Sequence, residues 1–119
     1  MSGTARTKKA VRVLLVDDDL IIRKVVCKTL QNSGYEVSMA EDGKKGMVVF
    51  EQCAPDIVLL DVEMPVMDGN QMCQALRKTE AGADIPILML TGARDKKSID
   101  KAYDMGATDY LPKPVAPIS

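Results

Sequence analysis

Three short stretches of the chain are continuously apolar, whereas two others mix apolar and polar residues. Residues 11–16 contain the run Val-Leu-Leu-Val, and residues 57–60 and 87–90 are apolar throughout. Such runs are typical of strands buried on both faces of a sheet. Residues 35–40 alternate instead, and residues 109–112 end in a proline, which a central strand does not tolerate. We therefore predict five strands, of which the first, third and fourth are central and the others lie at the edges.

Stretches with helical periodicity separate these strands. Asp19 is a suitable N-cap for the first helix, and Gly34 suits the left-handed residue beyond its end. The other three helices are predicted at about residues 44–53, 70–79 and 96–105. The inner face of the first helix is predicted to consist of Ile22, Val25, Val26, Thr29 and Leu30.

Repeated strand–helix units imply a parallel sheet with helices on both faces, joined by right-handed crossovers. Edges at the second and fifth strands fit the strand order 2-1-3-4-5. The predicted fold class is therefore a doubly wound α/β domain with a five-stranded parallel sheet, like that of flavodoxin and CheY.

Polar side chains follow the carboxyl ends of the predicted strands. Residues 17–19 are all aspartate and follow the first strand, Asp61 follows the third, Thr91 ends the fourth and Lys113 follows the fifth. Each alone is ordinary, because a carboxylate after a strand commonly caps a helix or forms a turn. Ligands of open α/β sheets, however, bind outside this edge. The joint occurrence of these residues therefore predicts a site there.

Carboxylates that crowd together repel one another unless a cation offsets them. Asp18 and Asp61 offer only oxygen ligands, which favours a hard cation such as Mg²⁺, and the backbone carbonyl of Glu63 is a candidate third ligand. A carboxylate is also a nucleophile towards phosphorus. We therefore predict that Asp61 accepts a phosphoryl group with Mg²⁺, while Lys113 and the Thr91 hydroxyl neutralise the phosphoryl oxygens.

The composition excludes some classes of function and disfavours others. The chain has 119 residues, enough for one domain, and a net charge of −1, which does not favour direct binding of nucleic acid. It contains no histidine, so it cannot use histidine in catalysis or in a metal site. Three cysteines without a C-x-x-C pair fit buried side chains in a reducing compartment.

The ends of the chain carry no membrane signal. Residues 1–10 lack the apolar core of a signal peptide, and we interpret them as a flexible basic leader before a domain at residues 11–119. No run approaches the length of about 18 apolar residues that predicts a membrane-spanning helix. We therefore expect a cytoplasmic domain.

Four segments, VRVLLVDDD, DIVLLDVEMPVMDG, PILMLTG and DYLPKP, resemble the signature blocks of response-regulator receiver domains, the CheY-like family of two-component systems. They occur in the family's order and cover the chain from about Val11 to Val115. The resemblance implies that a sensor histidine kinase or phosphotransfer protein donates a phosphoryl group. It also implies that the domain is a signalling switch for an output domain or downstream protein, and not a conventional enzyme.

The resemblance further implies a role for each site residue. Asp61 corresponds to the phosphoacceptor and Asp18 to the direct Mg²⁺ ligand. Asp17 corresponds to a second acid that acts through water and Lys113.

Two further roles concern the switch. Thr91 corresponds to the hydroxyl that turns towards the phosphoryl group, and Tyr110 to an aromatic side chain that then moves inward. The bond between Lys113 and Pro114 corresponds to a cis peptide. The fifth strand and the fourth helix are then expected to form the surface that reports phosphorylation.

The chain departs from the family after Pro114, where receiver domains normally add a fifth helix. Only Val115–Ser119 follow, with a second proline, and we expect the fifth helix to be missing or truncated. The first and fifth helices share one face of such a sheet, so apolar strand surface would be exposed there. Exposed apolar patches favour association, and we expect the domain to dimerise or to exchange elements.

Two alternatives have different chemistry. A phosphatase of the haloacid dehalogenase type requires D-x-D after its first strand, whereas the candidate nucleophile Asp61 follows the third and is part of Asp-Val-Glu. A pseudo-receiver would be a binding module that is never phosphorylated, but every key position here carries a competent residue. The output pathway and the kinase partner leave no signature in the sequence.

Overall fold

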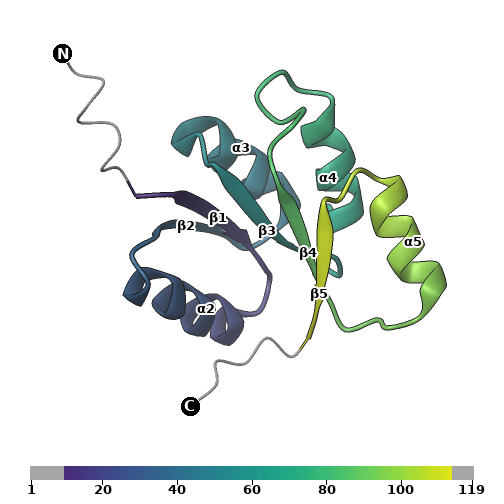
Figure 1. The fold of residues 1–119 in the computed structure, drawn as a ribbon, viewed down its shortest axis with the longest axis horizontal. Helices are drawn as coiled ribbons and strands as arrows, with labels where there is room; N and C mark the ends of the chain where they lie inside the picture. Colours follow the sequence, from purple (N-terminus) through teal and green to yellow (C-terminus); the bar gives the residue numbers. More distant parts are fainter. Residues whose placement is uncertain (1–9, 114–119) are drawn as a thin grey trace.

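Five parallel strands form one sheet in the computed structural model, which describes residues 10–113 (Figure 1). The order across the sheet is β2-β1-β3-β4-β5, which confirms the predicted order. Leu15 of β1 pairs with Met39 of β2 on one side and with Leu59 of β3 on the other. The strands are β1 (Arg12–Val16), β2 (Glu36–Ala40), β3 (Ile57–Asp61), β4 (Ile87–Thr91) and β5 (Asp109–Pro112).

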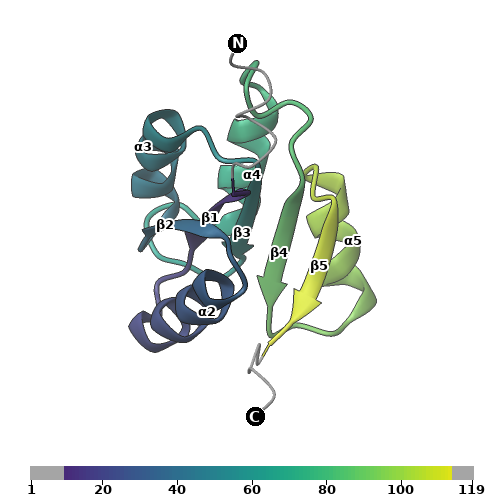
Figure 2. The same ribbon diagram turned by 60° about the vertical axis from the view of Figure 1, so that its left-hand side comes forward.

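Helices cover both faces of the sheet. In the described residues, α2 lies on one face and α3, α4 and α5 lie on the other (Figures 1 and 2). The helices are α2 (Leu20–Asn32), α3 (Gly43–Cys53), α4 (Gly69–Arg77) and α5 (Lys96–Asp104).

An aspartate caps the N-terminus of every one of these helices. The side chain of each accepts a backbone N–H bond from the first turn, which satisfies a donor that the helix itself leaves unpaired. The four caps are Asp19, Asp42, Asp68 and Asp95.

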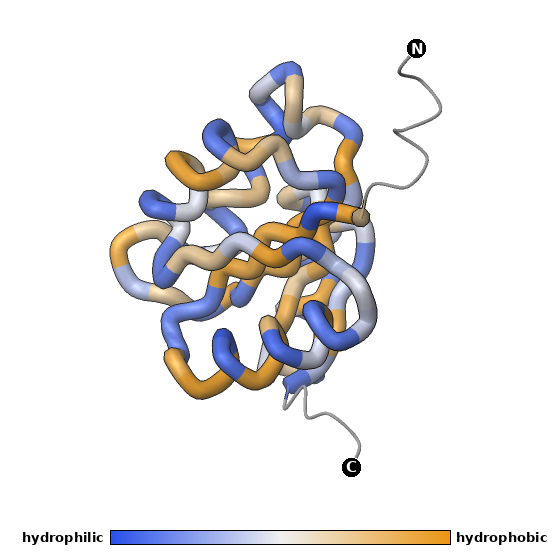
Figure 3. The backbone as a smooth tube through the Cα atoms, turned by 90° about the vertical axis from the view of Figure 1, so that its left-hand side faces the viewer, coloured by the Kyte–Doolittle hydropathy of each residue, from blue (hydrophilic) through white to orange (hydrophobic). Residues whose placement is uncertain are grey.

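The core consists of two layers, and β1 contributes to both. Leu14 and Val16 pack with Phe50 and the α4 residues on one face, whereas Val13 and Leu15 pack against α2 on the other. Adjacent residues of a strand point to opposite faces, so a strand covered on both sides must be apolar at every position. Figure 3 shows the result, with orange central strands inside a more polar shell.

Some predicted details are wrong. Thr29 is exposed, because the buried face of α2 contains Val26 and Cys27 instead. The Thr29 hydroxyl donates to the Val25 carbonyl of the same helix at 2.9 Å. The helices α4 and α5 end at Arg77 and Asp104, two residues and one residue earlier than predicted.

The three cysteines are free thiols, and Cys27 and Cys73 are buried as predicted, but Cys53 is only half-buried. On the α2 face, Leu111 of β5 is 37% exposed. No helix within residues 10–113 is both long and apolar enough to span a membrane. The leader was predicted at residues 1–10, of which the first nine lie outside the described residues. The Lys113–Pro114 peptide and the expected position of the fifth helix also lie outside them.

Candidate functional site

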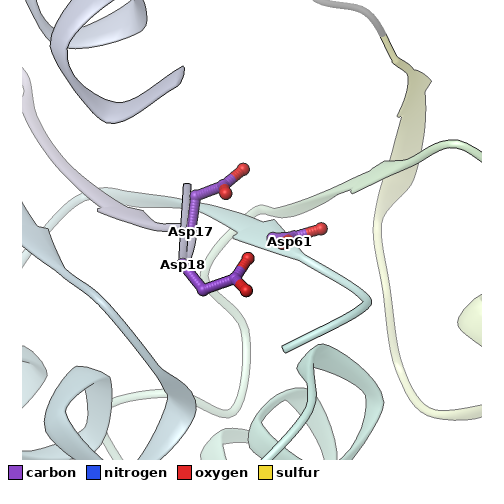
Figure 4. Close-up of side chains that lie close together, drawn as sticks. All are labelled: Asp17, Asp18 and Asp61. Carbon is purple, nitrogen blue, oxygen red and sulfur yellow. The ribbon is translucent and has the colours of Figure 1, made fainter. Parts of the chain in front are cut away.

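Three aspartates meet at the carboxyl ends of the central strands β1 and β3. Asp17 and Asp18 follow β1, Asp61 is the last residue of β3, and their carboxylate groups point to the same side (Figure 4). One oxygen from each carboxylate lies within 4.8 Å of the others. Asp17 and Asp61 are buried, with 0% and 1% exposure, whereas Asp18 is exposed. The fold therefore assembles the acidic cluster that strand order predicted.

Lys113 brings a cation into this cluster from beyond β5. Its Nζ lies 3.0 Å from Asp61 Oδ1 and 3.1 Å from Asp17 Oδ2. The backbone N–H of Lys113 donates to the Thr91 carbonyl at 2.7 Å, which continues the pairing of β4 and β5 to the site. One ammonium group thus pairs with both buried acids.

Thr91 ends β4 and is buried, with 4% exposure. Its hydroxyl accepts the Ala93 backbone N–H at 3.0 Å, so the oxygen is held by the loop that leads to α5. Glu63 has an exposed side chain, but its backbone N–H donates to Asp61 Oδ1 at 3.3 Å. Asp61 Oδ1 is therefore fixed from two sides, by Glu63 and by Lys113.

Burial raises the pKa of Asp61 to about 7. The hydrogen bond from Lys113 acts against this shift, while the charge of Asp17 adds to it. For Lys113 itself, burial alone would lower the pKa, but the bonds to Asp61 and Asp17 outweigh it and raise the pKa above the ordinary value. The Asp61 carboxylate is thus disfavoured mainly by burial, whereas the Lys113 ammonium is favoured by its two acidic partners.

The residues fit a divalent cation. Asp17 Oδ2 and Asp61 Oδ2 are buried and accept no hydrogen bond, although Lys113 lies near the first of them. Three carboxylates face one ammonium group, so negative charge is in excess. Buried polar atoms without partners are costly, and an all-oxygen ligand set suits a hard cation such as Mg²⁺.

The loop after Asp61 contains a tight turn. Met67 N–H donates to the Pro65 carbonyl at 2.8 Å around Val66, whose φ is +70°, an uncommon value for a β-branched residue. A Cβ on Gly69 would lie 2.2 Å from the Asp61 carbonyl oxygen, so only glycine fits. The loop therefore brings the start of α4 against the end of β3.

The sequence analysis also missed Arg23. This residue lies on the first turns of α2, and its Nη1 donates to the Asp17 carbonyl at 2.6 Å. Asp17 Oδ1 accepts the Asp19 backbone N–H at 2.8 Å, and the Asp17 N–H donates to Ala40 at 3.1 Å. The sequence alone does not predict such a contact, because many lysines and arginines on helices are simply solvated.

Tyr110 lies half-buried on β5, beside α5. Its ring meets that of Tyr103 edge to face, with centroids 6.2 Å apart and an interplanar angle of 84°. The Tyr103 hydroxyl donates to Asp109 at 3.1 Å. Tyr110 also packs against the larger core layer, so any movement of this ring is coupled to β5 and α5.

Known proteins share this sequence pattern. The family described as response regulator receiver domain matches residues 13–119. The DNA-binding dual master transcriptional regulator RpaA of Synechocystis is 44% identical over 103 residues, covering 87% of this chain and 43% of that protein. Response regulator MprA of Mycolicibacterium vanbaalenii is 48% identical over 107 residues, covering 89% and 45%. The chain thus spans less than half the length of these curated relatives.

Solved structures share the fold over most of their length. The chemotaxis response regulator CheY4 of Vibrio cholerae matches with a TM-score of 0.88 and 38% identity, covering 92% of this chain and 91% of that one. The receiver domain of sensor histidine kinase PA1611 from Pseudomonas aeruginosa, which has a magnesium ion coordinated in its active site cleft, matches with a TM-score of 0.82. It is 30% identical, covering 89% of this chain and 87% of that one.

Proposed function

The chain belongs to the response regulator receiver domain family of two-component phosphorelays, and from that premise we propose that Asp61 is its phosphoacceptor. The observation that supports this most is the asymmetry of the Asp61 carboxylate. Oδ1 is held by Lys113 and by the Glu63 N–H, whereas Oδ2 is buried and accepts no hydrogen bond. One oxygen is thus anchored while the other remains free to act as a nucleophile.

The transfer forms a bond between Asp61 Oδ2 and phosphorus. The bond from phosphorus to a histidine nitrogen of the donor breaks, and its electron pair stays on that nitrogen. These 119 residues contain no histidine, so the donor histidine lies outside them. Lys113 and the Thr91 hydroxyl neutralise the phosphoryl oxygens, as expected for a reaction in which the protein mainly positions groups and offsets charge.

Magnesium, when bound, offsets the charge of the acids and of the incoming phosphoryl group. Asp18 and Asp61 would hold the ion directly, together with the backbone carbonyl of Glu63. Asp17 would act through a bound water and through its contact with Lys113, 3.1 Å away.

The phosphorylated domain is proposed to switch between two conformations. The Thr91 hydroxyl breaks its hydrogen bond with the Ala93 N–H and turns to the phosphoryl group. The Tyr110 ring then moves into the space that the Thr91 side chain leaves. Phosphorylation adds charge and acceptor oxygens, and it shifts the population only by as much as it stabilises one conformation over the other. The surface of β5 and α5 then reports the change to a partner.

The domain acts as a signalling switch that catalyses only its own phosphorylation and dephosphorylation. Its phosphodonor is a sensor histidine kinase or a phosphotransfer protein, and its target is an output domain or a downstream protein. The relative RpaA is named as DNA-binding but is more than twice as long as the matched region. With a net charge of −1, this chain is not itself expected to contact DNA. We place it in the cytoplasm.

The domain is also proposed to associate with a second copy or to exchange elements with it. Among the described helices, α2 alone covers its face of the sheet, and Leu111 is 37% exposed there. Light scattering at increasing protein concentration should show a rising mass. A monomer at every concentration would contradict this proposal.

The phosphoacceptor is tested with Mg²⁺ and acetyl phosphate, followed by intact-mass measurement, and with beryllofluoride as an acyl-phosphate mimic. We expect a Mg²⁺-dependent adduct that Asp61→Asn abolishes. Asp84→Asn is the matched control, because Asp84 is an exposed aspartate in the loop before β4 and should leave the adduct unchanged. A folded wild-type protein that forms no adduct would instead support a binding module.

A further inference from the structure

Arg23 on α2 contacts the backbone of the acidic turn that follows β1. Its Nη1 lies 2.6 Å from the backbone carbonyl oxygen of Asp17, and the contact is partly buried. Within residues 10–113, no carboxylate lies within ion-pair distance of Arg23. The guanidinium group is therefore directed to the backbone of the acidic turn and not to an acidic side chain.

The carbonyl that Arg23 contacts belongs to the peptide between Asp17 and Asp18. Holding this oxygen fixes the plane of that peptide, and with it the directions in which both carboxylates leave the backbone. Besides the ion pair of Asp17 with Lys113, two other hydrogen bonds hold the same turn, from the Asp17 N–H to the Ala40 carbonyl and from the Asp19 N–H to Asp17 Oδ1. Arg23 supplies the third bond, and it is the only one of the three that comes from a side chain on α2.

Arg23 places its positive charge against the backbone carbonyl of Asp17. The remaining surface of its side chain lines an open cavity of about 380 Å³ beside the end of β2, together with Glu41 and Lys45. The cavity leaves room for other side chains at position 23. A lysine there would keep the charge but lose the planar fork of donors that orients a guanidinium group on a carbonyl.

We propose that Arg23 is a positioning residue of the phosphorylation site, which holds the Asp17–Asp18 peptide so that both carboxylates face Asp61. The proposal rests on the proposed function, because the positioned carboxylates matter as ligands of the cation. Loss of the Arg23 guanidinium group should weaken Mg²⁺ binding while the fold of the domain is retained. Arg23 does not touch the reacting atoms and acts only through the turn.

The test compares Arg23→Gln and Arg23→Lys with the wild-type protein. Lys24→Gln is the matched control, because it removes the same charge from an exposed neighbour on α2. Isothermal titration calorimetry gives the Mg²⁺ dissociation constant, and NMR hydrogen exchange of the Asp19 amide in metal-free protein reports the order of the turn. We expect Arg23→Gln to weaken Mg²⁺ binding by about three- to tenfold, the range for one lost hydrogen bond, and to speed Asp19 exchange. Arg23→Lys should fall between this and wild type.

Two results would overturn the proposal. In the first, Arg23→Gln lowers the melting temperature but leaves the Mg²⁺ dissociation constant and Asp19 exchange unchanged, which indicates a purely structural role. In the second, Lys24→Gln weakens Mg²⁺ binding as much as Arg23→Gln, which indicates a general charge effect. If Arg23→Gln does not fold, Arg23→Lys is judged by the same criteria. If the wild-type protein binds no Mg²⁺, the proposed function fails, while Asp19 exchange still tests the positioning of the turn.

Discussion

Lys113 Nζ lies 3.0 Å from Asp61 Oδ1, although the two residues are 52 positions apart in the sequence. The bond joins the residue after an edge strand to the last residue of a central strand. It anchors one oxygen of the proposed phosphoacceptor and offsets part of its charge. Most of the expected behaviour of the site follows from this contact.

Lys113→Met should separate cation binding from phosphorylation. The ammonium group competes with Mg²⁺ for Asp61 and Asp17, so its removal should leave Mg²⁺ affinity unchanged or increase it. Formation of the acetyl phosphate adduct should slow by about tenfold or more, because one group that neutralises the phosphoryl oxygens is lost. Calorimetry and intact-mass kinetics measure the two effects. Lys97→Met, at an exposed position on α5, should change neither.

The stability of the metal-free domain should fall as the pH rises from about 4 to about 7. The pKa of Asp61 is raised from 3.8 to about 7 in the folded state, so within this window the folded protein holds a proton that the unfolded chain has lost. The stabilisation that the Asp61 proton gives is fully present below a pH of about 4 and is lost as the pH rises through about 7. Thermal unfolding at several pH values without Mg²⁺ should show this decline.

Asp61→Asn should flatten this pH dependence and stabilise the metal-free protein at pH values above about 7, because a neutral amide replaces a buried carboxylate. Added Mg²⁺ should raise the melting temperature of the wild type but not of this variant. Asp84→Asn should retain the wild-type profile. An equal slope in Asp61→Asn and wild type would show that another group controls the pH dependence.

Gly69→Ala should destabilise the domain by about 2–4 kcal/mol, because its Cβ would lie 2.2 Å from the Asp61 carbonyl oxygen and the loop or α4 must shift. Chemical denaturation measures the loss. Gly92→Ala is the matched control, since a Cβ there meets no atom within 4 Å and its effect should stay within about 0.5 kcal/mol. Similar losses in the two variants would contradict a steric cause.

Arg77 should be a major support of the end of the sheet opposite the acidic cluster. Its guanidinium group donates to the carbonyls of Gly82, Ile85 and Gly106 and to the Thr108 hydroxyl, at 2.6–3.2 Å. Arg77→Met leaves these acceptors without their partner and should cost about 2–4 kcal/mol in unfolding free energy.

The matched control is Lys78→Met, because Lys78 is the exposed neighbour of Arg77. It should lose less than about 0.5 kcal/mol. A loss below about 1 kcal/mol in Arg77→Met would mean that water replaces the arginine at these carbonyls.

The order of the elements and the composition of the site could be predicted from sequence. Unbroken apolar runs around Leu14, Leu59 and Leu88 are enough to identify central strands, because a strand covered on both faces needs an apolar residue at every position. Strand order then places the residues after β1, β3 and β4 at one edge, which brings Asp17 and Asp61 together without any coordinates. The capping of α2 by Asp19 could also be predicted from the sequence, since it depends on neighbouring residues only.

The details of contact and burial were decided by the tertiary structure. The pKa of Asp61 depends on how completely the sheet and its loops exclude water, which no local pattern records. The contact of Arg23 with Asp17, the close approach at Gly69 and the four bonds of Arg77 depend on how helices lie against strands. The prediction that Thr29 lies on the inner face of its helix was wrong for the same reason. A periodic pattern states that a helix has an inner face, but the packing of α2 on β1 and β2 selects which residues form it.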